Sequence, residues 1–446
     1  MSKILIKHVT IINEGRSFKG NVLIDGQFIS RVSEADIHPD KDTCIINGEN
    51  KLLLPGVIDD QVHFREPGLT HKGDITTESR AAVAGGVTSY MEMPNTNPQT
   101  ITIKALNDKY ELASSKSAAN YSFYFGATND NIEEIHKVNP QKTPGVKVFM
   151  GASTGNMLVD NIRTLEKIFA ESPVLIATHC EDETTIRNNI VMCKQKYGED
   201  IPMSCHPLLR SEEACFISST LAVGLAHKYN STLHVLHLST ARELSLFEKG
   251  PVTGKKITSE ACIHHLWFND SYYESRDTLI KWNPAIKTEK DRLALIDALI
   301  DDRIDVIATD HAPHTLIEKS NKYFQAPSGG PMVQHSLLAM LEFVKRGIFT
   351  IEKVVQKMCH APADLFKIDR RGYIREGYYA DLVLVNPAKS FEITISNLLY
   401  KCHWSPLEGE IMHHKIDLTF VNGNIVYQHG EVVDNGVHSM ALRFLR

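Results

Sequence analysis

The middle of the chain alternates between short apolar runs and longer segments with helical periodicity. The apolar runs cover residues 56–63, 87–93, 122–126, 146–150, 174–179, 233–238, 256–261 and 305–310, and helical segments are predicted over 76–85, 103–117, 210–229 and 289–301. Apolar runs of this length are typical of buried parallel strands. Eight of them, each followed by a loop and a helix, predict a closed (β/α)8 TIM barrel of the α/β class. An open doubly wound sheet is the alternative, but no GxGxxG pattern follows the first run.

Both ends of the chain have a different pattern. Short alternating stretches at 4–6, 22–24 and 28–29, and again at 380–385 and 418–427, are separated by Gly, Asn and Asp. This is typical of β-sheet, and Asn422-Gly423 marks a tight hairpin turn. We therefore expect residues 1–53 and 374–446 to form one small β-sandwich domain, and residues 54–373 to form the barrel.

Composition limits the classes of function. The 446 residues are 42% hydrophobic and 23% charged, which provides an ample core. A net charge of −6 with interspersed signs offers no basic face, so no nucleic-acid partner is expected. No apolar run approaches the roughly 20 residues of a membrane span, and the N-terminus lacks the pattern of a signal peptide. Eight scattered cysteines without a CxxC pair indicate reduced thiols and a cytoplasmic protein.

Polar side chains cluster where the predicted strands end. They are His63 and Arg65 after the first run, Asn95 after the second, Lys147 in the fourth, His179 in the fifth, His237 in the sixth and Asp310 in the eighth. Alone, each has an ordinary structural interpretation: Asp310 could cap a helix, and Lys147 could extend to the surface. In a barrel, however, all of them meet at one mouth. Imidazole and carboxylate together suit zinc, so the pattern predicts a shared metal site.

Several longer motifs, in a fixed order, resemble those of the dihydroorotase family in the amidohydrolase superfamily. They lie at 56–68, 93–98, 179–182, 237–240, 281–284, 305–314, 326–329 and 375–383, so the resemblance covers nearly the whole chain. It implies a zinc enzyme that reversibly cyclises N-carbamoyl-L-aspartate to (S)-dihydroorotate in pyrimidine (UMP) biosynthesis. It also implies a (β/α)8 barrel with a small β domain from both termini.

The resemblance assigns roles position by position. His179, His237 and an N-carboxylated Lys147 would hold one zinc, and His63, Asp310 and the same carbamate a second. A metal-bound hydroxide would attack the ring amide, with Asp310 as general acid and base. The substrate would be bound by the side chains or main chain of Arg65, Asn95, Asn283, His314, Ser328 and Gly329. Residues 315–325 resemble a mobile loop beside the site.

One departure from the family bears on the metal. The family's first strand normally carries His-x-His, and here Gln61 replaces the first His. An amide oxygen is a weaker zinc donor than imidazole, so the site served by His63 should lose affinity. The sequence therefore leaves one or two zinc ions open. It also leaves open whether Lys147 is carboxylated. Some relatives have an Asp that does not bridge in the same way, whereas the context of Lys147 resembles the branches with a carboxylated lysine.

Several polar residues near these positions are expected to have structural roles. Asp59 is expected to be a structural hydrogen-bond partner. Glu181 and Asp182 either orient His179 or cap the next helix, and capping is favoured. His264 and His265 are expected to face opposite ways as neighbours on a strand.

Two other functions compete with the dihydroorotase interpretation. A hydantoinase or allantoinase would share the metal residues, but Arg65, Asn95 and His314 favour an anionic substrate. A non-catalytic dihydroorotase-like subunit of aspartate transcarbamoylase would fit Gln61 but not the retained ligand set. The resemblance also implies a homodimer and makes aspartate transcarbamoylase a candidate partner.

Overall fold

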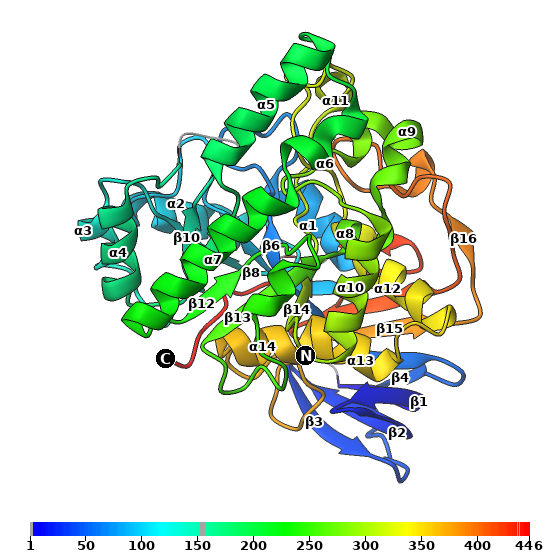
Figure 1. Cartoon of the computed structure of the whole chain (residues 1–446). Helices are drawn as coiled ribbons and strands as arrows, with labels where there is room; N and C mark the ends of the chain where they lie inside the picture. The colour runs from blue at the N-terminus through cyan, green and yellow to red at the C-terminus, as the bar shows by residue number, and fades with distance from the viewer. Residues whose placement is uncertain (1–2, 152–156, 435, 437) are drawn as a thin grey trace.

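Parallel strands close a barrel around the middle of the molecule (Figure 1). The computed structural model describes residues 3–151, 157–434, 436 and 438–446. Within them the barrel strands are β6 (Val57–Val62), β7 (Val87–Glu92), β8 (Asn120–Phe123) with β9 (Phe125–Gly126), β10 (Val146–Phe149), β11 (Ile176–His179), β12 (Leu233–Val235), β13 (Ile257–Cys262) and β14 (Val306–Ala308). β8 and β9 are two halves of the third strand position. The ring closes between the last strand and the first, where the His63 amide donates to the His311 carbonyl at 2.7 Å.

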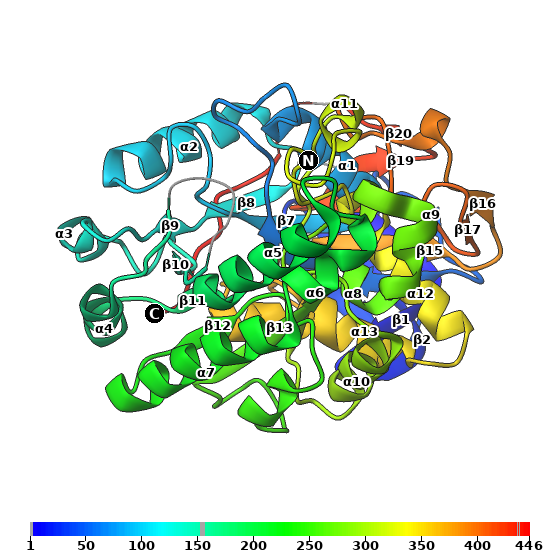
Figure 2. The same ribbon diagram turned by 45° about the horizontal axis from the view of Figure 1, so that its top comes forward.

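Helices surround the barrel (Figure 2). They are α1 (Ile75–Ala84), α2 (Ile103–Lys116), α3 (Ile132–Ile135), α4 (Ile162–Glu171), α5 (Glu183–Tyr197), α6 (His206–Leu209), α7 (Glu212–Tyr229), α8 (Ile263–Trp267), α9 (Tyr273–Arg276), α10 (Glu289–Ile300), α11 (Leu316–Lys319), α12 (Ser336–Lys345), α13 (Ile351–Val355) and α14 (Ala361–Phe366). Capping boxes at Asp74 and Thr288 satisfy the first amides of α1 and α10. The predicted barrel and its four predicted helices are confirmed.

The sixth unit differs from the expectation that every strand is followed by a helix. Between β12 and β13 the described chain forms only a 3₁₀ turn, Glu243–Leu246. Gly250, Pro251 and Gly254 follow within a few residues. Glycine and proline disfavour helix, so this crossover runs back as a loop.

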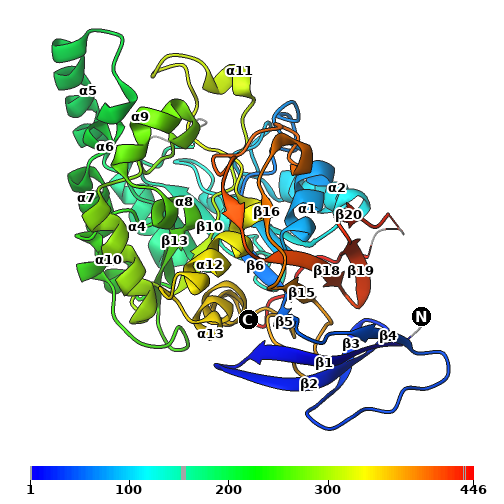
Figure 3. The same cartoon turned by 90° about the vertical axis from the view of Figure 1, so that its right-hand side faces the viewer.

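Strands from both chain ends form one mixed sheet below the barrel (Figure 3). Its order is β20-β19-β18-β15-β5-β1-β2-β3, and β4 also pairs with β1. The strands are β1 (Ile4–Asn13), β2 (Arg16–Asp25), β3 (Phe28–Ser33), β4 (Cys44–Asn47), β5 (Leu52–Pro55), β15 (Leu382–Asn386), β18 (Lys415–Val421), β19 (Asn424–Gln428) and β20 (Glu431–Val432). β5 joins the two ends, because it pairs with β1 on one side and with β15 on the other. The predicted hairpin turn lies at Asn422 and Gly423, both with positive φ.

Two parts of the C-terminal segment pack on the barrel instead of joining this sheet. The stretch that carries β16 (Phe391–Glu392) and β17 (Ile411–Met412) lies against the barrel mouth, where Trp404 Nε1 donates to the His314 carbonyl at 2.7 Å. The final residues pair with β8 through Ala441, and Leu442 and Phe444 join the apolar cluster that includes Tyr124. Among the described helices, none has the length and apolar character needed to cross a bilayer.

Candidate active site

A small cavity of about 30 Å³ lies at the carboxyl ends of the barrel strands. This is where TIM barrels carry their chemistry. The predicted site residues that line it are His63, Arg65, Lys147, His179, His237, Asn283, Asp310, Ser328 and Gly329. The other two, Asn95 and His314, line an adjoining hollow of about 790 Å³ that shares Arg65 with the cavity. The fold therefore brings residues from all parts of the barrel to one place.

His179 and His237 face each other across this cavity. His179 Nδ1 lies 3.0 Å from His237 Nε2, and both rings are buried. Burial lowers the pKa of both imidazoles, so they are neutral. The other His179 nitrogen, Nε2, lies 3.0 Å from Glu181 Oε2, which makes it the N–H side and turns the Nδ1 lone pair toward His237.

The geometry of this pair fits a metal ion. Two nitrogens at about 2.0–2.1 Å from a tetrahedral zinc are separated by roughly 3.3 Å, close to the observed 3.0 Å. His237 Nδ1 is buried and has no hydrogen-bond partner among the described residues, so it can carry the ring proton. With the proton on Nδ1, His237 Nε2 and His179 Nδ1 both present lone pairs to one cation.

Glu181 takes the role that the sequence analysis ranked second, the orientation of His179. Burial alone would raise its pKa, but Arg210 and His179 lower it to about 2. Glu181 forms an ion pair with Arg210 as well as contacting His179. Asp182 is the helix cap, since it accepts from the Thr185 amide at 2.7 Å. The predicted helix cap is thus right for Asp182 and wrong for Glu181. The sequence feature that indicates the true role of Glu181 is a carboxylate two residues after a strand-end histidine.

Lys147 lies beside the two histidines, fully buried on β10. Its Nζ is 4.7 Å from the centroid of the Phe149 ring. Burial lowers the pKa of the amine to about 8, although Asp310 and Glu260 oppose the shift. About a tenth of the amine is therefore neutral at pH 7, which is the form that reacts with carbon dioxide.

Asp310 is held through one carboxylate oxygen. Oδ1 lies 3.1 Å from His63 Nε2 and accepts from Gln61 Nε2 at 3.2 Å. Both contacts involve Oδ1, and the Asp310 side chain lines the cavity. Asp310, Arg65 and His237 all adopt positive φ, at 44°, 74° and 40°. Non-glycine residues rarely do so, and such strain is concentrated at functional sites.

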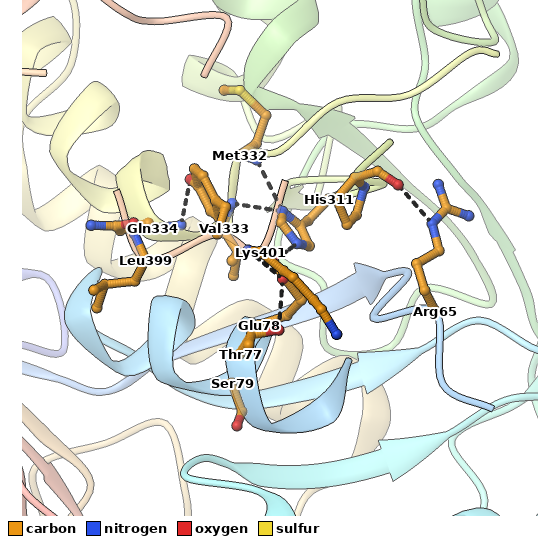
Figure 4. A network of polar contacts seen from close by, with 12 residues as sticks. Arg65, Thr77, Glu78, Ser79, His311, Met332, Val333, Gln334, Leu399 and Lys401 are labelled. Carbon is orange, nitrogen blue, oxygen red and sulfur yellow. Dashed lines mark hydrogen bonds and ion pairs between the residues drawn. The ribbon is translucent and has the colours of Figure 1, made fainter. Parts of the chain in front are cut away.

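The strand that carries Asp310 is anchored from both sides. Asp59 confirms the structural role expected for it, because its carboxylate accepts from the Thr309 amide at 3.2 Å and from Thr309 Oγ1 at 2.6 Å. His311 turns away from the cavity and lies 2.9 Å from Glu78 on α1, while its Nδ1 accepts from the Met332 amide at 3.0 Å (Figure 4). These contacts fix the backbone on each side of Asp310.

Arg65 presents a buried positive charge where the cavity and the larger hollow meet. Its Nε donates to the Pro313 carbonyl at 3.0 Å, and the pKa of its guanidinium, lowered by burial to about 10, keeps it charged at pH 7. His314 Nε2 lies 3.0 Å from Arg65 and 3.0 Å from the Ser328 carbonyl, and its Nδ1 faces Lys72 Nζ at 3.0 Å. The Arg65 guanidinium and the Lys72 amine therefore both lie beside His314, which suits a carboxylate.

Glycines at two turns bring the loops around the cavity together. Gly68 has φ +85°, and a Cβ there would lie 1.8 Å from the Asn97 carbonyl oxygen, so the Arg65 loop can approach the Asn95 loop only with glycine. On the opposite side Ser328 Oγ donates to Asn283 Oδ1 at 3.0 Å, and Gly329 follows with φ +122°.

A second polar cluster lies deeper in the barrel. Asp60, His234 and Glu260 are fully buried, with ligand-type atoms within 4.8 Å of one another. It contains none of the predicted metal ligands. His234 Nδ1 lies 2.9 Å from Thr258 Oγ1, and Nε2 lies 3.3 Å from Asp60 and 3.5 Å from Glu260. Burial lowers the pKa of His234, but the two carboxylates raise it to about 9, so the ring is an imidazolium paired with both carboxylates.

The expectation for His264 and His265 is wrong. Both lie on the short helix α8, not on a strand, because β13 ends at Cys262. Both are buried, and the His264 ring stacks on Trp282 with centroids 4.4 Å apart. They pack behind the cavity wall and do not line it.

Comparison with known proteins shows the family. The amidohydrolase family model matches residues 52–426. The chain is 30% identical over 413 residues to a dihydroorotase from Methanosphaera stadtmanae, covering 92% of this chain and 94% of that protein. It is 32% identical over 431 residues to a dihydroorotase from Carboxydothermus hydrogenoformans, covering 95% and 98%.

Solved structures show the same fold. An L-hydantoinase (dihydropyrimidinase) from Arthrobacter aurescens superposes with a TM-score of 0.93 at 24% identity, covering 99% of this chain and 100% of that one. A dihydropyrimidinase from Brevibacillus agri gives a TM-score of 0.89 at 23% identity, with both chains covered fully. From the family match and the dihydroorotase relatives, the chain belongs to the amidohydrolase family, and within it to the dihydroorotases.

Proposed function

We propose that the protein is a metal-dependent dihydroorotase that interconverts N-carbamoyl-L-aspartate and (S)-dihydroorotate in pyrimidine biosynthesis. The observation that carries this proposal is the buried Arg65 with His314 directly beside a paired His179 and His237. An anion site adjoining a metal site suits a cyclic amide that bears a carboxylate. We also propose zinc as the metal, with Lys147 carboxylated, and the cytoplasm as the compartment. All eight cysteines are unpaired, in keeping with a reducing environment.

The chain's own groups divide the reaction between them. Arg65, Asn95 and His314 hold the substrate carboxylate and so fix the ring, while Asn283 and Ser328 border its other side. A bound zinc would supply a water acidified to a pKa of about 7 and would polarise the amide carbonyl. His179, His237 and Lys147 would be its ligands.

Asp310 moves the proton. With Oδ1 engaged by Gln61 and His63, Oδ2 takes the proton from the attacking water and returns it to the ring nitrogen that leaves. In the reverse direction it removes a proton from the carbamoyl nitrogen as that nitrogen attacks the protonated carboxyl group, and it returns the proton to the oxygen that leaves as water.

The test is turnover by the purified full-length protein loaded with zinc. We expect hydrolysis of dihydroorotate and cyclisation of carbamoyl-aspartate, and a fall of about 10²- to 10⁴-fold in kcat for Asp310→Asn. Asp130→Asn, an exposed carboxylate, is the matched control and should be fully active. A zinc-loaded wild type with no activity would contradict the proposal and favour a non-catalytic subunit.

A second substrate separates dihydroorotase from hydantoinase activity. Dihydrouracil has the same ring without the carboxylate, so it leaves the Arg65 site unpaired. Sites built to bind a polar group reject analogues that lack it by about 10⁴-fold. Comparable kcat/KM values for the two substrates would instead favour the hydantoinase alternative.

A further inference from the structure

Gln61 makes two side-chain contacts in the wall of the cavity. Its Nε2 donates to Asp310 Oδ1 at 3.2 Å, and its Oε1 faces Cys262 Sγ at 3.7 Å. The side chain is buried, with 1% of its surface exposed. The amide therefore lies between a carboxylate at one end and a thiol at the other.

The partners at the two ends decide which way the amide points. An amide oxygen turned toward Asp310 would set two acceptors against each other, whereas the N–H side forms a charge-assisted hydrogen bond. Burial raises the pKa of the Cys262 thiol well above its usual value, so the thiol keeps its proton and donates. The same thiol lies 3.6 Å from Glu260 Oε1, which also accepts from the His237 amide at 3.0 Å. Gln61 therefore directs its N–H, not its oxygen, to Asp310.

His63 contacts the same oxygen in the same sense. An imidazole nitrogen 3.1 Å from a carboxylate oxygen presents an N–H there, because a lone pair would be repelled. Asp310 Oδ1 thus has two donors. A cation placed between His63 and Asp310 would also face the Gln61 N–H.

From these contacts we propose that Gln61 is a positioning residue that holds Asp310, and that the chain binds one metal ion, at His179 and His237, with no second ion between His63 and Asp310. This inference rests on the proposed function and deepens it. The sequence expectation was a weakened second site served by an amide oxygen. In the structure that oxygen is turned away, and a hydrogen bond takes the place of the second ion in fixing Asp310.

Metal content tests the proposal directly. The wild-type protein and variants are stripped with a chelator, reloaded with excess zinc in bicarbonate buffer, desalted and measured by mass spectrometry of the metal. We expect about one zinc per chain for the wild type and about two for Gln61→His. His63→Ala should stay at one and His179→Ala should fall to zero. Two zinc ions in the wild type, one in Gln61→His, or loss of zinc in His63→Ala would each overturn the proposal.

Kinetics tests the positioning role. Gln61→Met keeps the length of the side chain but removes the N–H donor. We expect kcat to fall by about 10- to 100-fold, as for the loss of a hydrogen bond to a charged group, with KM within about twofold. Circular dichroism and thermal unfolding check that the variant folds. An unchanged kcat, or a rise in KM alone, would contradict the role.

The proposed activity and the metal count can fail separately. A wild type that binds one zinc, gains a second through Gln61→His and turns over no dihydroorotate would refute the activity and keep the metal assignment. A fully active wild type with two zinc ions would support the activity and refute the metal assignment. Zinc-edge anomalous diffraction on the loaded protein, with one peak beside His179 and His237, gives the location independently of stoichiometry.

Discussion

Replacing Glu181 by Gln should weaken both metal binding and folding. The carboxylate contacts His179 at 3.0 Å and forms an ion pair with Arg210 in a fully buried position. A neutral amide keeps the shape but removes the charge that orients the His179 ring. Loss of such a carboxylate behind a ligating histidine typically costs about 10- to 100-fold in metal affinity.

The magnitude for folding follows from the pKa of Glu181. A fall from 4.5 to about 2 means that the surroundings favour the carboxylate by about 3 kcal/mol. Because the folded-state pKa is depressed, this stabilisation is present above pH 4.5 and is lost as the pH falls toward 2. The free energy of unfolding of the metal-free wild type should therefore fall between pH 4.5 and about 2. Glu181→Gln should lack the part of this fall that comes from the Glu181 carboxylate.

Zinc competition with a chromophoric chelator and urea unfolding of the metal-free protein measure the two effects. Asp182→Asn is the matched control, because it removes the neighbouring charge, retains a good helix cap and does not contact His179. The reasoning is refuted if Glu181→Gln binds zinc within twofold of the wild type, or if Asp182→Asn loses as much affinity.

Two further predictions concern buried titratable groups. Carboxylation of Lys147 needs the neutral amine, and the pKa of this group is about 8. The rate at which zinc restores activity to the metal-free protein, at fixed carbon dioxide, should therefore fall by about tenfold for each pH unit well below 8. ¹³C NMR with labelled bicarbonate should show a carbamate signal that Lys147→Arg lacks. His234, with its pKa raised from 6.5 to about 9, contributes stability below pH 6.5 that is lost as the pH rises through 9. Between pH 6.5 and 9 the wild type should lose about 3 kcal/mol more free energy of unfolding than His234→Gln does. If the two proteins gave parallel curves of unfolding free energy against pH, His234 would not be an imidazolium.

The barrel was predictable because its strands are apolar throughout and its helices begin with strong caps. The run that became β10 is apolar except for Lys147, and Asp74 and Thr288 mark the starts of α1 and α10. The missing sixth helix was also foreshadowed by Gly250 and Gly254. Each of these features lies within the strand, helix or loop that it predicts, so it can be read from the sequence alone.

The fine structure of the site was not predictable, because it depends on contacts between distant residues. The direction of the Gln61 amide is set by Asp310 and Cys262, which lie 249 and 201 positions later. Glu181 looked like a helix cap because its partner Arg210 lies on a different element. The cluster of Asp60, His234 and Glu260 joins three strands, and nothing in any one of those segments reveals the other two.

The position of β5 has a consequence for synthesis on the ribosome. β5 is complete once Pro55 has been made, but its antiparallel neighbour β15 does not begin until Leu382. For the time needed to translate the intervening residues, the nascent N-terminal strands expose an unpaired apolar border to other chains. We therefore infer that slow elongation, or premature termination within the barrel, would promote aggregation through Leu52–Pro55 even though the mature protein keeps this strand covered.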